Sequence, residues 1–220
     1  MKPIFEAVME SERAVLNLLS KSRELAKSKA DEDYLVESIP HWVYAGDTPL
    51  HLACAALRTA SAKLLLEHGA DIHSQNRRGA TPLHYACDPR PNSGGVWNSE
   101  AQAALIDLLI RSGAKVNAAD KGKATALHRA VRARSAAAVR CLLESGASVD
   151  VRLGKLGSTP LHLAVQSTGA SGTANSVDEQ LEIIRLLLAH GAEVNAPDSR
   201  GRTAVEWAVS EPILSALLKK

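Results

Sequence analysis

The chain has 220 residues, a formal net charge of +2 and an ordinary hydrophobic fraction of 45%, while aromatic residues make up only 3%. This length allows a sizeable core in one or two domains, and the near-neutral charge does not by itself argue for DNA binding. No stretch approaches 18 uninterrupted apolar residues and the acidic N-terminus lacks the apolar run of a signal peptide, so we expect neither a membrane span nor a leader. Three cysteines without close spacing favour reduced thiols and a cytoplasmic protein.

In chain order, the first expected element is a helix over residues 3–8, PIFEAV, followed by a second helix near residues 11–20. A long connection over about residues 21–46 comes next. It contains three aromatic residues, Tyr34, Trp42 and Tyr44. These side chains either pin the connection to the helices or offer rigid contact area to a partner, because tyrosine and tryptophan are prominent in interface energetics.

Downstream of this connection, one six-residue motif occurs five times. The copies are TPLHLA, TPLHYA, TALHRA, TPLHLA and TAVEWA, beginning at Thr48, Thr81, Thr125, Thr159 and Thr203. Threonine caps helices and proline suits the first helical position, so each copy predicts the start of a helix. A second motif of the type LLLEHGADI follows each of the first four copies, and it predicts a second helix that ends at its glycine. Each unit should therefore comprise helix, turn, helix and an extended polar finger.

These two motifs resemble those of ankyrin repeat proteins, and the resemblance covers nearly the whole chain. It implies an all-α ankyrin repeat solenoid of about six helix-turn-helix repeats, with a concave side built from finger loops and first helices. We expect a single ankyrin repeat domain over residues 1–220. The N-terminal cap repeat and the long connection are expected over residues 1–47, and the C-terminal cap repeat over residues 203–220. The four repeats between them are expected at residues 48–80, 81–124, 125–158 and 159–202.

Two of the repeats carry an insertion. The spacing from the capping threonine to the glycine of the second motif is 21 residues in two repeats and 32 in the other two, so the extra residues lie between the two helices. The insertions are residues 88–98, DPRPNSGGVWN, and 166–176, QSTGASGTANS, and Asn98 is the expected cap of the helix that follows. Their equivalent positions 78 residues apart suggest a duplicated two-repeat unit, and such inserted segments resemble those of bacterial ankyrin proteins of unassigned role. The loops are either tolerated surface decoration or binding elements, which Trp97 favours.

Four histidines occupy the same place in the repeated motif, namely His51, His84, His128 and His162. Helices of successive repeats pack about 8–10 Å apart, whereas the ligands of one zinc ion all lie within about 2.0–2.3 Å of it. The ankyrin resemblance instead implies a structural histidine that braces the finger through hydrogen bonds, so we expect no metal and no cofactor. Cys54 and Cys87 meet the same geometric objection, and Cys141 is expected in the core. The sequence shows no nucleophile elbow, phosphate loop or paired carboxylates, so we expect no enzyme.

Basic and aromatic residues gather on the finger tips and the exposed turns of the first helices. The candidate partner-binding residues are Trp42, Tyr44, Arg77, Arg78, Tyr85, Trp97, Lys121, Arg129, Arg132, Lys155 and Arg200. They form either a solvated charged face or a groove for an acidic partner. We expect non-catalytic binding of another protein, whose identity the sequence does not give, through the concave surface of fingers and first helices. The alternative is binding of nucleic acid or another phosphate-bearing ligand through the basic rim.

Equal offsets from the capping threonines predict how these candidates are arranged. Arg77 and Lys121 each lie four residues before a threonine, and Tyr44 continues that row. Tyr85 and Arg129 each lie four residues after one. Together with Arg78, these residues should therefore form one continuous patch with the two tyrosines at its edge.

Overall fold

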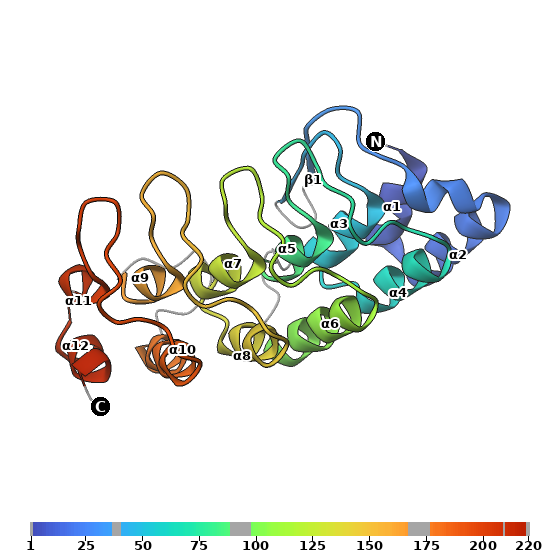
Figure 1. Ribbon diagram of the computed structural model, residues 1–220. Coiled ribbons are helices and arrows are strands. Elements are labelled where there is room, and N and C mark those ends of the chain that lie inside the picture. Colours follow the sequence, from blue (N-terminus) through green and yellow to red (C-terminus); the bar gives the residue numbers. More distant parts are fainter. Residues whose placement is uncertain (1, 37–40, 89–97, 167–176, 209, 219–220) are drawn as a thin grey trace. The chain divides into compact units, whose positions relative to one another are not determined.

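The computed structural model describes residues 2–36, 41–88, 98–166, 177–208 and 210–218 (Figure 1). These residues form pairs of α-helices joined by extended finger loops, with one short β-hairpin, and this confirms the expected all-α ankyrin fold class. By its internal contacts the chain divides into two compact units, Met1–Lys115 and Val116–Lys220.

Three helix pairs make up the described part of the first unit. They are α1 (Pro3–Glu10) with α2 (Glu12–Lys21), α3 (Pro49–Ala55) with α4 (Thr59–Glu67), and α5 (Pro82–Ala86) with α6 (Ser99–Arg111). The first helices pack in the order α1, α3, α5, and the second helices in the order α2, α4, α6. Fully buried side chains such as Phe5, Leu50, Leu65, Leu83 and Leu105 fill the space between the helices.

The second unit repeats this arrangement with helices of its own. They are α7 (Ala126–Arg132) with α8 (Ala136–Glu144), α9 (Pro160–Ala164) with α10 (Val177–Ala189), and α11 (Ala204–Trp207) followed by α12 (Glu211–Leu218). Figure 1 shows α7, α9 and α11 in one layer and α8, α10 and α12 in another, with the fingers extending from the first layer. Leu127, Leu142, Leu161, Ile184 and Leu187 form its buried core.

The local causes of these helices are the ones that the motifs predict. Each capping threonine accepts a hydrogen bond from the backbone of the third helical residue, and the side chain of that residue bonds back to the threonine backbone. The glycines that follow four of the second helices, Gly69, Gly113, Gly146 and Gly191, have positive φ angles between 85° and 98°. A side chain would be strained in that conformation, so glycine ends the helix there.

The N-terminal connection contains more regular structure than we expected. It includes a 3₁₀ helix, η1 (Arg23–Lys27), and an antiparallel hairpin of β1 (Tyr34–Val36) and β2 (His41–Val43). The ring of Tyr34 meets that of Phe5 edge-on, with the ring centroids 6.3 Å apart, and this contact pins the hairpin to α1.

Both insertions lie between the two helices of a pair, as the spacing predicted. The first helices of these two repeats, α5 and α9, have 5 residues, whereas α3 and α7 in the repeats without an insertion have 7. The second helices, α6 and α10, have 13 residues, whereas α4 and α8 have 9. The side chain of Asn98 accepts a 2.9 Å hydrogen bond from the N–H of Ala101, which confirms it as a helix cap. Residues 89–97, with Trp97, and 167–176 lie outside the described residues.

A buried glutamine joins the shortened first helix to the extended second helix in each of these repeats. Gln102 Nε2 donates to the carbonyl of Ala86 at 2.9 Å, and Gln180 Nε2 donates to the carbonyl of Ala164 at 2.8 Å. These carbonyls belong to the last residues of α5 and α9, and the last carbonyls of a helix lack an intrahelical partner. The two glutamines lie at equivalent positions of the two repeats, as do the two alanines, and this agrees with the inferred duplication.

Candidate functional site

The repeat histidines are buried and bind the chain itself. His51 Nδ1 accepts from the backbone N–H of Thr48 at 3.0 Å, and its Nε2 lies 3.0 Å from the carbonyl oxygen of Ala80 in the next finger. Since Nδ1 acts as an acceptor and a carbonyl can only accept, the ring is neutral with its proton on Nε2. The other three histidines accept from their own threonines at 3.2 Å. His128 and His162 also reach finger carbonyls at 3.0 Å, so these rings brace fingers against first helices.

The environment of these rings and of the thiols suits a structural role. Burial lowers the pKa of His128 to about 4, although hydrogen bonds to the carbonyls of Val151 and Ser158 oppose the shift. Burial also raises the pKa of the Cys54 thiol, which keeps it protonated and unreactive. Within the described ranges, no group of three or more His, Cys, Asp or Glu side chains is arranged to hold a metal ion.

Each finger with an aspartate or asparagine five residues before the capping threonine is closed by that side chain. These residues are Asn76, Asp120 and Asp198. In each of them Oδ1 accepts hydrogen bonds of 2.8–3.1 Å from the backbone N–H groups two and four residues further on. The finger tips are therefore built turns whose backbone donors are already satisfied.

The residue four positions after the capping threonine ties the first helix to the same finger side chain. Tyr85 is only 3% exposed, and its hydroxyl accepts from Asn76 Nδ2 and donates to Asp47, both at 2.9 Å. Arg129, whose side chain is 17% exposed, donates from Nη2 to Asp120 at 3.0 Å. We expected both residues at an exposed patch. In the structure the polar ends of both side chains instead point inward. We therefore leave Tyr85 out of the candidate surface and assign Arg129 a structural role in holding the finger of Asp120.

The last repeat has the same tie, made by a tryptophan. Trp207 Nε1 donates to Asp198 Oδ2 at 3.2 Å, and the Arg202 guanidinium lies 4.8 Å from the centre of the indole while pairing with the same carboxylate at 3.0 Å. Burial alone would raise the pKa of Asp198. The backbone N–H groups of Arg202 and Arg200 and the Arg202 side chain outweigh burial, and the pKa falls to about 2. The carboxylate therefore stays ionised inside the finger.

The outer face of the hairpin differs from these satisfied fingers. Leu35 lies directly opposite Trp42 across the two strands, and the side chains are 46% and 51% exposed. Asp33 and Tyr44 lie directly outside the two strands, and the alternation of side chains, continued by one residue, assigns them to the same face as Leu35 and Trp42. The inner face carries Tyr34 and buried Val43.

Two arginines of the next finger complete this face. The guanidinium carbons of Arg77 and Arg78 lie 5.4 and 4.5 Å from the ring centre of Tyr44, within cation–π range. Arg77 also pairs with the carboxylate of Asp33, while its backbone N–H bonds to the carbonyl of Ala45 at 2.9 Å. We define the hairpin strip as Asp33, Leu35, Trp42, Tyr44, Arg77 and Arg78.

The structure thus brings Tyr44 together with Arg77 and Arg78, as the sequence predicted, and Trp42 of β2 lies two residues before Tyr44. It adds Asp33 and Leu35, which we had not predicted. The alternating runs Tyr-Leu-Val and His-Trp-Val were the available signal, because aromatic and β-branched residues in short runs favour strands.

The remaining basic candidates belong to the second unit. Lys121, Arg132, Lys155 and Arg200 are exposed there. Their continuity with Arg77 and Arg78 stays a prediction.

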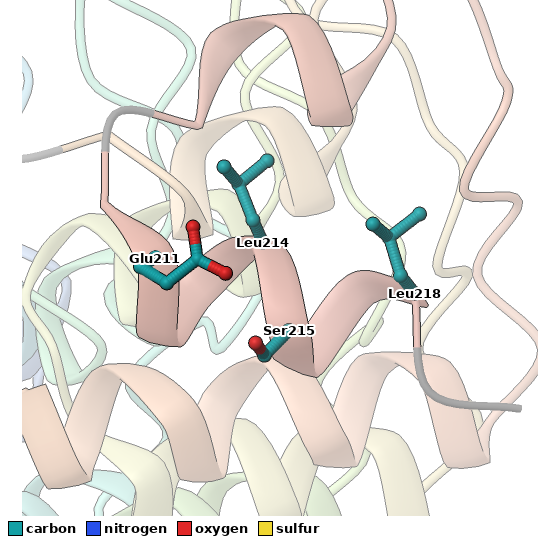
Figure 2. A pocket seen from close by; sticks show the side chains of 4 residues that line it. All are labelled: Glu211, Leu214, Ser215 and Leu218. Atoms are coloured by element: carbon teal, nitrogen blue, oxygen red, sulfur yellow. The ribbon is translucent and has the colours of Figure 1, made fainter.

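A shallow hollow lies on the last helix of the second unit. Figure 2 shows the four lining side chains, Glu211, Leu214, Ser215 and Leu218, which all come from α12. One carboxylate and one hydroxyl on a single helix do not provide the convergent polar groups of a catalytic site. Across the described residues, none of the helices is both long and apolar enough to cross a bilayer.

Comparison with known proteins agrees with this architecture. A model of three ankyrin repeat copies matches residues 3–92 and 97–177, and a single ankyrin repeat model matches residues 156–199. The chain therefore belongs to the ankyrin repeat family, whose repeats typically mediate binding to other proteins.

Curated relatives carry the same repeats within longer chains. The mouse (Mus musculus) B-cell lymphoma 3 protein homolog is 33% identical over 168 residues, which cover 76% of this chain and 33% of the relative. The human (Homo sapiens) B-cell lymphoma 3 protein is 32% identical, with 86% of this chain and 36% of the relative covered. A glycerophosphocholine phosphodiesterase of Schizosaccharomyces pombe is 32% identical, with 87% and 15% covered. The chain thus spans about a third or less of the length of these relatives, and the expected likeness to bacterial proteins stays a prediction.

Proposed function

We propose that the chain is a non-catalytic module that binds another protein through its fingers and first helices, with the hairpin strip as the principal contact in the first unit. The observation that carries this proposal is the composition of the strip. An exposed tryptophan, a tyrosine and two arginines lie together on one face. Tryptophan, tyrosine and arginine are the residues in which binding energy concentrates at protein interfaces.

Several features support the non-catalytic part of the proposal. The repeat histidines use ring nitrogens for internal hydrogen bonds, and two of the three free thiols are buried. The phosphodiesterase relative matches over only 15% of its own length, so the likeness concerns its repeats. We also propose a cytoplasmic location, because all three cysteines are free thiols.

A second candidate is binding of nucleic acid or another phosphate-bearing ligand. It is favoured by the exposed basic residues Lys121, Arg132, Lys155 and Arg200 of the second unit.

Affinity purification from extract of the source organism, carried out with and without nuclease treatment, tests the main proposal. The tagged chain should retain a protein partner, and Arg77→Ala/Arg78→Ala should lower its recovery. Arg111→Ala is the matched control, because Arg111 is an exposed arginine of α6 whose ion pair, among the described residues, is with Asp107 of its own helix. If the chain retains nucleic acid and no protein, the proposal is wrong and the second candidate replaces it.

A further inference from the structure

The hairpin strip has a chemical polarity along its length. One end is the exposed cross-strand pair of Leu35 and Trp42. The other end is the stack of Arg77 and Arg78 on Tyr44. Two residues along a strand span roughly 7 Å, which is about the backbone separation between Trp42 and the Tyr44 that carries the two arginines.

The two arginines differ in whether they form an ion pair within the described residues. Arg77 is paired with Asp33, whose pKa is lowered first by the hydrogen bond from the N–H of Ala45 and then by the guanidinium of Arg77. Arg78 makes no ion pair with any residue that the structure describes, and it lies closer to the Tyr44 ring. The ring holds the guanidinium in place, while its N–H groups remain available to a carboxylate in bidentate geometry.

We infer that the hairpin strip binds an acidic segment of a partner protein in which an apolar side chain lies two or three residues from a carboxylate. The apolar side chain packs on Leu35 and Trp42, and the carboxylate pairs with Arg78. The inference rests on the proposed function and specifies the chemistry of the partner.

The charges of the strip favour a peptide over nucleic acid. The carboxylate of Asp33 pairs with Arg77 and compensates its charge, so the strip does not offer two free guanidinium groups. A single guanidinium outside an ion pair cannot replace the several phosphate contacts that give nucleic-acid binding its affinity. Leu35 and Trp42 also provide apolar area opposite one another, which suits an aliphatic or aromatic anchor.

A displayed library of random 12-residue peptides, selected against the full chain, tests the inference. The recovered peptides should pair Asp or Glu with Leu, Ile, Phe or Trp two or three residues away. Fluorescence anisotropy with the best peptide should show at least tenfold weaker binding for Arg78→Ala and for Trp42→Ala. Arg78→Lys should be intermediate, because lysine lacks the planar fork, and Arg111→Ala should match the unmodified chain. Circular dichroism checks that the variants stay folded, as expected for exposed positions.

The inference is overturned if the selected peptides lack acidic residues, or if no peptide is selected. It is also overturned if the best peptide binds Arg78→Ala as tightly as it binds the unmodified chain. A labelled 20-nucleotide single strand that binds through Arg78 would also overturn it in favour of phosphate recognition. If the native partner is still captured by Trp42→Ala and Arg78→Ala, the inference fails while the proposed protein-binding function stands.

Discussion

At the scale of single residues, the buried ring of His128 links the stability of the fold to pH. His128 has a pKa of about 4 in the folded chain against an ordinary value of 6.5. Between these values the unfolded chain binds a proton that the folded chain does not. The stabilisation is therefore complete above pH 6.5 and is lost as the pH falls toward 4.

We predict that this single group lowers the free energy of unfolding by about 3 kcal/mol between pH 7 and pH 4. Urea denaturation at several pH values measures the effect. His128→Gln should be less stable at pH 7 but should lose correspondingly less on acidification, because glutamine does not titrate. Equal pH slopes for the two proteins would contradict the prediction.

Two residues with left-handed backbone should respond in opposite ways to glycine. Lys123 has φ +63° and is exposed, so Lys123→Gly should stabilise the fold by up to about 1 kcal/mol through relief of strain. Arg134 has φ +57°, but its buried guanidinium donates to the carbonyl of Ala164 at 2.7 Å and to that of Gln166. Arg134→Gly should therefore destabilise by at least about 1 kcal/mol. Chemical denaturation of both variants decides this, and a stabilising Arg134→Gly would refute the assigned role.

At the scale of elements, the buried glutamines join α5 to α6 and α9 to α10. We predict that Gln102→Ala lowers the free energy of unfolding by about 1–3 kcal/mol, because the carbonyl of Ala86 loses its buried donor. Gln180→Ala should cost less, since Arg134 still donates to the carbonyl of Ala164. Urea denaturation of the two variants gives the comparison, and the reverse order would contradict it.

The helix pairs were predictable because their signals are local. A capping threonine, a proline at the first position and a closing glycine act within one or two turns, and Asn98 was identified as a cap in the same way. The hairpin and the inward direction of Tyr85 were not predicted. They depend on cross-strand pairing and on Asp47, which lies 38 residues away in the sequence. The contacts of Arg77 and Arg78 with Tyr44 were therefore predictable from the repeat offsets, whereas the places of Asp33 and Leu35 beside them were not predicted.

At the scale of the whole molecule, a net charge of +2 is too small to dominate association. We predict that partner affinity falls by less than about tenfold between 50 and 200 mM salt, because one or two ion pairs contribute. Binding through 6–10 phosphates would lose roughly 10³–10⁵ over the same range. Calorimetric titration of the purified partner at three salt concentrations measures the slope, and a steep loss would favour the phosphate-binding alternative.

The ties between fingers and first helices also bear on how a repetitive chain finds its correct pairing as it folds. Three fingers carry a polar residue five positions before the capping threonine, and the first helix bonds to it: Asn76 with Tyr85, Asp120 with Arg129, and Asp198 with Trp207. The other two repeats have an apolar residue or glycine at that finger position and leucine on the helix: Val43 with Leu52, and Gly154 with Leu163. Where a finger with Asn76, Asp120 or Asp198 docked one repeat out of place against Leu52 or Leu163, it would bury its polar side chain against leucine, at a cost of about 1–3 kcal/mol. Near-identical repeats invite such slippage, and these matched pairs penalise it.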